Sequence, residues 1–222
     1  MQRDYLKKEY ILDYVSSRLD DFIGECIIIN DAKFHHNTSY SSTSSIIKNN
    51  ILSMEELARK KIKNYSEDVL SVMADTDSHA NGSSGISLSI VGLDDINEDE
   101  FEYDPFNVNQ VDLLIQSDVV ARRNSVHYGN EYIASDEIEA EKIRSIDVRL
   151  FKYIDLLISK GKIKDDEKAI ATLVQRYNCL RNMAITLKQV GLDIPIREMS
   201  YDNCCSLDVD MLASSPKLIL RN

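Results

Sequence analysis

Apolar residues recur at helical spacing in three segments of the first third of the chain. Between residues 8 and 23 they follow steps of three and four, which predicts an amphipathic helix that Gly24 ends. Residues 41–49 show the same periodicity over a shorter stretch. A capping-box sequence at residues 53–56 predicts a third helix that runs to about Lys63.

Strand patterns dominate the middle of the chain. The run at residues 25–30 is apolar and β-branched, which predicts a buried strand, and the polar segment 33–39 is expected to close it. Residues 86–91 alternate apolar and small polar side chains, as a strand with one exposed face does. Further strands are predicted at residues 111–115, 131–133 and 143–148.

The pattern changes after about residue 150. Residues 150–158 and 166–190 are periodic in the helical sense and predict a hairpin of two helices. The tail from Tyr201 shows no regular pattern and is expected to be irregular. The chain thus begins with helices, continues with strands and ends with a helical hairpin. This order is typical of an α+β fold and not of alternating βαβ units. We therefore expect one domain over residues 1–150 and a helical C-terminal extension over residues 151–222.

Composition narrows the class of protein. The chain has 26 Lys and Arg against 37 Asp and Glu, a net charge of −11, and such a surface repels nucleic-acid phosphates. Strong nucleic-acid binding is therefore not expected. No apolar run approaches the roughly 18 residues that span a bilayer, and the first residues lack a signal peptide's apolar stretch. We expect no membrane association and a cytoplasmic location. The four cysteines lack CxxC spacing, which favours reduced thiols over a zinc framework.

Two loop motifs suggest a ligand but fit no template. Asp75, Asp77 and His79 alternate like calcium ligands, yet Ala80 stands where a calcium loop needs glycine. Residues 82–85 (GSSG) lack the flanking sequence of a phosphate-binding loop. Neither loop is assigned a ligand, and no metal is expected.

A more specific pattern is an ordered set of polar residues spread over about a hundred positions. It consists of an HxT segment before a helix, two small hydroxyl residues in a central strand, and an acid that opens a late strand: His36, Asn37 and Thr38, then Ser87 and Ser89, then Glu131. Residues 138–146 follow the acid with the sequence IEAEKIRSI. In this order and spacing the chain resembles the ADP-ribosyltransferase superfamily over roughly residues 30–150.

The resemblance implies an α+β fold with a split antiparallel sheet as its core, here with an N-terminal helix and a C-terminal helical hairpin. It implies an enzyme of the glycosyltransferase class that uses NAD as its substrate, without a metal, and transfers ADP-ribose. The acceptor would be a protein side chain, a nucleobase or a small molecule. Toxins and effectors that act in a host cytoplasm are typical of such enzymes. The oligomeric state is left open.

The resemblance also implies roles for individual residues. Glu131 matches the catalytic acid, which stabilises the positive charge that builds on the ribose as nicotinamide leaves. His36 matches the histidine that orients NAD by donating to a ribose hydroxyl. The backbone of Asn37, within the HxT segment that Thr38 completes, would hold the nicotinamide amide. Ser87 or Ser89 would occupy the central-strand position.

Stacking on the nicotinamide ring is the one role without a motif, and Tyr40 or Tyr65 is the candidate for it. Two positions depart from the family pattern. Asn37 stands where the family usually has glycine, although Asn tolerates unusual backbone angles better than most residues. Gly129 replaces the acid or Gln that arginine-modifying members carry two residues before the catalytic Glu, which disfavours arginine as the acceptor.

A second interpretation fits the acidic charge and the helical ends of the chain. Under it the chain is a non-catalytic interaction or structural protein, for example a viral or phage adaptor or inhibitor. The two interpretations differ in one geometric requirement, because only the enzyme needs His36 and Glu131 to converge on one site.

Overall fold

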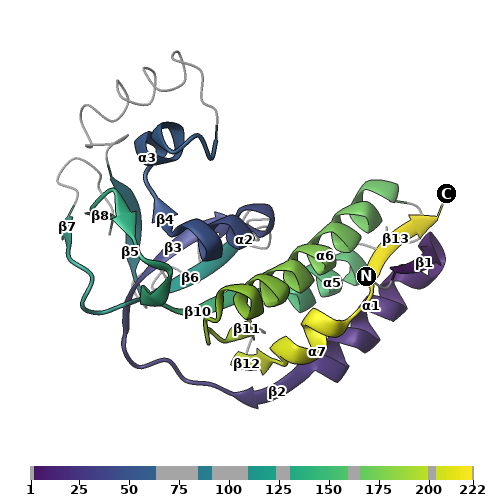
Figure 1. Ribbon diagram of the computed structural model, residues 1–222. Helices are drawn as coiled ribbons and strands as arrows, with labels where there is room; N and C mark the ends of the chain where they lie inside the picture. Colours follow the sequence, from purple (N-terminus) through teal and green to yellow (C-terminus); the bar gives the residue numbers. More distant parts are fainter. Residues whose placement is uncertain are drawn as a thin grey trace.

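The computed structural model describes residues 3–63, 85–91, 110–123, 131–159, 166–199 and 204–221. These residues form an α+β fold, as the order of patterns predicts (Figure 1). The loops at 75–84 and the residues Tyr65 and Gly129 lie outside the described residues, so the expectations that concern them are not addressed by the structure.

A sheet of nine strands runs through the molecule in the order β2-β12-β11-β10-β6-β3-β5-β8-β7. Its strands are β2 (Ile23–Cys26), β3 (Ala32–Ser39), β5 (Ile86–Ile90), β6 (Gln110–Gln116), β7 (Ala121–Arg123), β8 (Glu131–Ala134), β10 (Ile143–Val148), β11 (Ile196–Met199) and β12 (Cys204–Leu207). Neighbours are antiparallel except β10 and β11, which are parallel. The sheet is therefore mixed.

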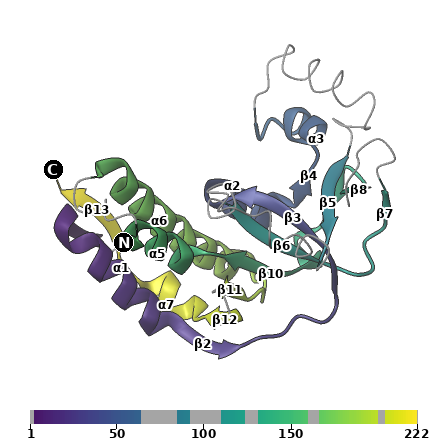
Figure 2. The ribbon, with the colours of Figure 1, turned by 180° about the vertical axis from the view of Figure 1, so that it is seen from behind.

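Two short ladders lie outside this sheet. One joins β1 (Arg3–Lys7) and β13 (Lys217–Arg221) in parallel, and the other joins β4 (Ile51–Leu52) and β9 (Glu137–Ile138). Figures 1 and 2 both show β1 and β13 side by side, with the two marked chain ends close to them. The two ends of the chain thus meet in one ladder.

Six α-helices occur among the described residues: α1 (Lys8–Phe22), α2 (Tyr40–Asn49), α3 (Met54–Arg59), α5 (Leu150–Ser159), α6 (Glu167–Val190) and α7 (Val209–Ser214). Side-chain caps begin several of them: Ser53, the first residue of the predicted capping box, accepts from the backbone N–H of Glu56, and Asp166 accepts from that of Ala169. Gly191 ends α6 with φ of 72°, a left-handed conformation that favours glycine.

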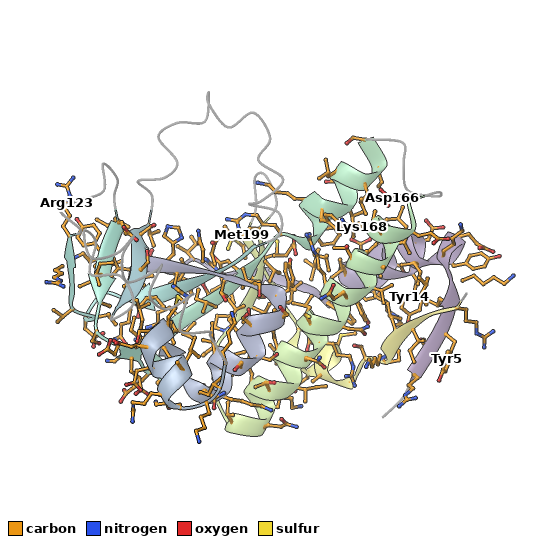
Figure 3. The ribbon with its side chains drawn as sticks, turned by 90° about the horizontal axis from the view of Figure 1, so that it is seen from above. Tyr5, Tyr14, Arg123, Asp166, Lys168 and Met199 are labelled. Carbon is orange, nitrogen blue, oxygen red and sulfur yellow. The ribbon has the colours of Figure 1, made fainter. Side chains whose placement is uncertain are left out.

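One hydrophobic core joins the sheet and the helices: α2 and α5 contact the sheet, and the long helix α6 packs against both of them and against α1. Strand register places Phe34, Leu113 and Ile146 on the face that is buried there, because cross-strand partners share a face. The opposite face of the same strands carries His35 and Asp112 together with the buried Leu114, whereas His36 pairs with Leu113 and lies on the buried face. Figure 3 shows Arg123 of β7, the last strand of this sheet, at one end of the molecule and Tyr5 of the separate strand β1 at the other.

Three local predictions are wrong. Residues 25–30 are not a buried strand: β2 is an exposed edge strand, residues 27–30 have no regular structure, and Ile28 is 76% exposed. Gly24 does not cap α1 but lies in β2, where a Cβ would stand 2.7 Å from Ser206 Oγ. The third helix ends at Arg59 and not at about Lys63.

The C-terminal tail is also more regular than expected, since it contains β12, α7 and β13. The position predicted as a domain boundary falls between β10 and α5. Strands from both sides of it belong to the nine-stranded sheet, because β11 and β12 follow it in the chain and continue the sheet from β10. No helix among the described residues has the length and apolar character needed to cross a membrane.

Candidate functional site

The candidate site lies where β3, β5 and β8 run next to one another (Figure 1). β3 carries the HxT segment, β5 carries Ser87 and Ser89, and β8 begins at Glu131, as predicted. The exposed and buried residues alternate along β5, so Ser87 is exposed while Ile86 and Leu88 are buried. Three segments that are far apart in the sequence therefore present polar side chains within a span of three strands.

The sheet is split between β3 and β5. Among the described residues, their pairing consists of Phe34 with Ile90 and His35 with Ser89. The ladder between β3 and β6 continues to Ser39, and the first residues of β5 pair with β8 instead. The HxT segment thus has a paired strand on its β6 side, while the pairing with β5 stops one residue before His36.

His36 bridges this split. Its Nδ1 lies 3.0 Å from the carbonyl oxygen of Ser87. The hydroxyl of Ser87 in turn donates to Oε1 of Glu131 at 2.5 Å. Ser87 therefore connects the imidazole and the carboxylate, one through its backbone and one through its side chain.

The hydrogen bond of His36 fixes its tautomer. A carbonyl oxygen only accepts, so Nδ1 must carry the proton. Burial lowers the pKa of His36 below its usual value, and this effect outweighs the carbonyl of Ser87, which acts in the opposite direction. At neutral pH the ring is uncharged and Nε2 is an acceptor. A ligand hydroxyl would therefore donate to His36, the reverse of the expected polarity.

The other residues of the predicted set lie around this connection. Ser89 pairs with Glu131 on one side and with His35 on the other. Asn37 is exposed and opposes Asp112 of β6, and Thr38 is half-buried. The structure brings all of them to the same three strands, and hydrogen bonds join His36, Ser87 and Glu131 within the set.

Tyr40 is the exception, and its assignment to the nicotinamide pocket is wrong. It is the first residue of α2 and is 5% exposed. Its hydroxyl accepts from the backbone N–H of Arg149 at 3.3 Å, and the guanidinium of Arg176 lies 5.4 Å from its ring. Burial, with the charge of Glu198, raises the pKa of Tyr40. Its ring faces are occupied by the core and cannot stack on a ligand.

Sequence reasoning missed a second polar group on this part of the sheet. Asp112 of β6 pairs with Arg149 at 2.5 Å and lies 3.8 Å from His35, measured between Oδ1 and Nδ1. Burial alone would raise the pKa of Asp112, but His35 and Arg149 outweigh it and hold that pKa below its usual value. The sequence feature that could have indicated this group is an acidic residue inside an apolar strand pattern, at residues 111–115 (VDLLI).

A cavity of about 890 Å³ lies beside the far end of β8. It is lined by Ile133 and Ala134, by Arg122 of β7, and by Lys142 and Glu139 near β9, among others. Neither His36 nor Glu131 lines it. Ile133 pairs with Ser87, so the cavity begins two residues beyond Glu131 on the same strand.

The described residues show neither the side-chain arrangement of a metal site nor a disulfide. No group of three or more His, Cys, Asp or Glu side chains there is arranged to hold a metal ion. All four cysteines are free thiols. Comparison with known proteins gives no family: no family model matches the chain, and neither the curated proteins nor the solved structures contain a significant match.

Proposed function

We propose that this chain is an NAD-dependent ADP-ribosyltransferase-like enzyme that cleaves the nicotinamide–ribose bond and transfers ADP-ribose to an acceptor. The observation that carries the proposal is the connection His36–Ser87–Glu131 across three neighbouring strands. These are the residues that the resemblance selects from three distant segments. The split between β3 and β5 supports an ADP-ribosyltransferase-like core in the same way.

Glu131 supplies the charge that this reaction needs. As the C–N bond to nicotinamide breaks, its electron pair goes to the nicotinamide nitrogen and positive charge builds on the ribose. A carboxylate next to the sugar stabilises that charge more in the transition state than in the ground state. The hydrogen bond from Ser87 orients the carboxylate before the substrate binds, which reduces the reorganisation that the reaction requires.

His36 orients the ribose in this proposal. Because Nδ1 is held by the carbonyl of Ser87, the imidazole has a fixed orientation and Nε2 accepts a hydrogen bond from a ribose hydroxyl. NAD is the substrate and no metal is involved. The acceptor is a protein side chain or a nucleobase, and the reaction takes place in the cytoplasm, which is a host cytoplasm if the protein is an effector.

The test measures nicotinamide release from NAD by the full chain. Glu131→Gln removes the charge but keeps the shape, so release is expected to fall by about 100- to 1000-fold. Ser87→Ala leaves the carboxylate without its orienting donor, so a smaller loss of about 10-fold is expected. Glu141→Gln is the matched control, because Glu141 is an exposed glutamate on the short 3-10 turn after β9.

Equal, background release by the wild type and Glu131→Gln would contradict the proposal. If NAD then also fails to raise the melting temperature of the wild type, the non-catalytic interaction protein becomes the better interpretation.

A further inference from the structure

Three of the four cysteines gather at one edge of the nine-stranded sheet. Cys26 ends the edge strand β2, and Cys204 and Cys205 begin the neighbouring strand β12 (Figures 1 and 2). The two strands are antiparallel, and their register sets Cys205 directly opposite Cys26. Two thiols from the first and last parts of the chain thus face each other across two strands.

A hydrogen bond next to this pair shows which kind of cross-strand pair it is. The backbone N–H of Ile27 donates to the carbonyl oxygen of Cys204 at 3.3 Å. Hydrogen-bonded and non-hydrogen-bonded pairs alternate along an antiparallel ladder, so Cys26 and Cys205 form a non-hydrogen-bonded pair. The Cα atoms of such a pair are about 4.5 Å apart, and a disulfide needs Cα atoms about 4.4–6.8 Å apart. The pair therefore lies within the range that a disulfide can bridge.

The third thiol of the group, Cys204, is engaged elsewhere. Successive side chains of a strand point to opposite faces, so Cys204 and Cys205 lie on opposite faces of β12. The Cys204 thiol donates to the carbonyl oxygen of Ile27 at 3.5 Å, and Arg197 donates to the same oxygen at 2.9 Å. Burial raises the pKa of the Cys204 thiol and outweighs the opposite effect of the Arg197 charge, so its reactive thiolate form is disfavoured.

Cys26 is the thiol that a small oxidant can reach. β2 is exposed along its whole length, and Cys26 is exposed with it, whereas Cys205 is half-buried. An accessible cysteine with a second cysteine beside it, which can resolve the first oxidised product, is typical of redox-sensitive pairs. Cys26 and Cys205 combine these two properties.

Independently of the proposed function, we propose that Cys26 and Cys205 are a redox-sensitive pair that forms a disulfide between β2 and β12 when a small-molecule disulfide such as oxidised glutathione is in excess. The Cys26 thiolate attacks one sulfur of the oxidant, the S–S bond of the oxidant breaks, and one glutathione thiolate leaves with the electron pair. The Cys205 thiolate then attacks the Cys26 sulfur of the mixed disulfide and releases the second glutathione. The two protein thiols lose two electrons and two protons, and the oxidant is reduced to two molecules of glutathione.

The bond ties the edge strand covalently to the sheet. β2 pairs with β12 alone in the nine-stranded order, so the disulfide reinforces the one ladder that holds it. It also closes a loop of roughly 180 residues between the two cysteines, and a cross-link over a long loop restricts the unfolded chain strongly. The melting temperature of the oxidised protein is therefore expected to be about 5–10 °C higher than that of the reduced protein.

The experiment equilibrates the full chain in buffers of reduced and oxidised glutathione and then blocks the remaining thiols with a maleimide. Peptide mapping by mass spectrometry identifies the cysteines that are linked. The wild type is expected to contain a Cys26–Cys205 link within one chain, which dithiothreitol removes. Half of the folded chains are expected to carry it at a glutathione ratio about 10-fold more reducing than the urea-unfolded chain needs, because the fold holds the two thiols together.

Four variants assign the roles of the thiols. Cys26→Ser and Cys205→Ser are expected to abolish both the link and the rise in melting temperature with oxidant. In Cys205→Ser the exposed Cys26 is expected to stop at the mixed disulfide with glutathione, because the resolving thiol is missing. Cys204→Ser is the matched control, since it removes the adjacent thiol of the same strand, and Cys179→Ser is a second control on α6. Both controls are expected to keep the link.

Several outcomes for the wild type would overturn the proposal. A wild type that stays reduced in excess oxidised glutathione overturns it, and so does one that stops at the mixed disulfide. A link from Cys204 to either of the other two thiols, or links found only between two copies of the chain, also overturn it. These results come from the wild-type protein, so they decide the matter even where a variant fails to fold.

Discussion

The burial and pairing of polar residues differ between the two halves of the nine-stranded sheet. In the half formed by β10, β11, β12 and β2, which we call the packed half, the central strands β10 and β11 bury a pair of charged side chains. Arg197 is 5% exposed and makes two hydrogen bonds to the 3% exposed Asp147. In the half formed by β3, β5, β8 and β7, the split half, Ser87 is exposed and Glu131 is half-buried.

The difference shows where this fold can carry out chemistry. The buried pair in the packed half stabilises a fixed arrangement and is closed to a ligand, and each partner would leave an uncompensated charge if the other were removed. The split half links its polar groups by single hydrogen bonds at a place where the ladder between two strands stops. The exposed Ser87 of the split half is therefore accessible to a ligand, whereas Arg197 and Asp147 of the packed half are not.

Among the variants that test this comparison, a truncated side chain in the core is expected to have the largest effect on stability. Leu180 of α6 is fully buried, so Leu180→Ala is expected to lower the free energy of unfolding by about 2–5 kcal/mol. Ser87→Ala, in the split half, is expected to change it by less than about 0.5 kcal/mol. Urea denaturation checks both values. Nicotinamide release should show the opposite ranking, and a similar loss of stability in the two variants would break the comparison.

A smaller effect is expected at Glu198, which belongs to the packed half. Its two carboxylate oxygens accept from the backbone N–H groups of Leu150 and Phe151, each at 3.0 Å, at the start of α5. Burial raises the pKa of Glu198 from 4.5 to about 8, against the effect of these two hydrogen bonds. The folded state therefore holds a proton that the unfolded state has already lost.

This stabilising contribution is fully present below pH 4.5 and is lost as the pH rises through about 8. Glu198→Gln is expected to cost about 1–2 kcal/mol at the acidic end, since an amide replaces one acceptor oxygen by a donor. The wild type should lose stability relative to this variant as the pH rises. Thermal denaturation across this range measures the difference, and a difference independent of pH would contradict the assigned pKa.

The smallest effect is expected from Tyr40→Phe. The variant loses one hydrogen bond, from the backbone N–H of Arg149, so the expected loss of stability is about 0.5–1 kcal/mol. The affinity for NAD, measured by titration calorimetry, is expected to be unchanged because the ring lies in the core. Weaker NAD binding by this variant would show that Tyr40 contributes to the site and would contradict its assignment to the core.

Sequence patterns predict the elements whose stability is local. The helices α1, α2, α5 and α6 follow apolar periodicity, and β5, β6, β8 and β10 follow short strand patterns, so all eight are confirmed within a few residues. β1, β13 and β2 could not be predicted in the same way. β1 forms because it pairs with β13 at the other end of the chain, and β2 forms because it pairs with β12.

The candidate site likewise has a part that the sequence predicts and a part that depends on tertiary structure. The order of His36, Ser87 and Glu131 along the chain predicts that they converge, and hydrogen bonds join both His36 and Glu131 to Ser87, although strand register puts His36 and Glu131 on opposite faces of the sheet. The register that sets His35 opposite Ser89 on one side and near Asp112 on the other depends on how three strands align. Tyr40 was assigned by residue type alone, and only the packing of α2 against α6 shows that it belongs to the core.

The ladder between β1 and β13 has a consequence for how the protein is made. Arg3–Lys7 leaves the ribosome about two hundred residues before Lys217–Arg221, so β1 has no partner while those residues are being made. The buried face of α1 is likewise left exposed until α6 emerges. The nascent chain therefore carries the apolar face of α1 uncovered until α6 has been made.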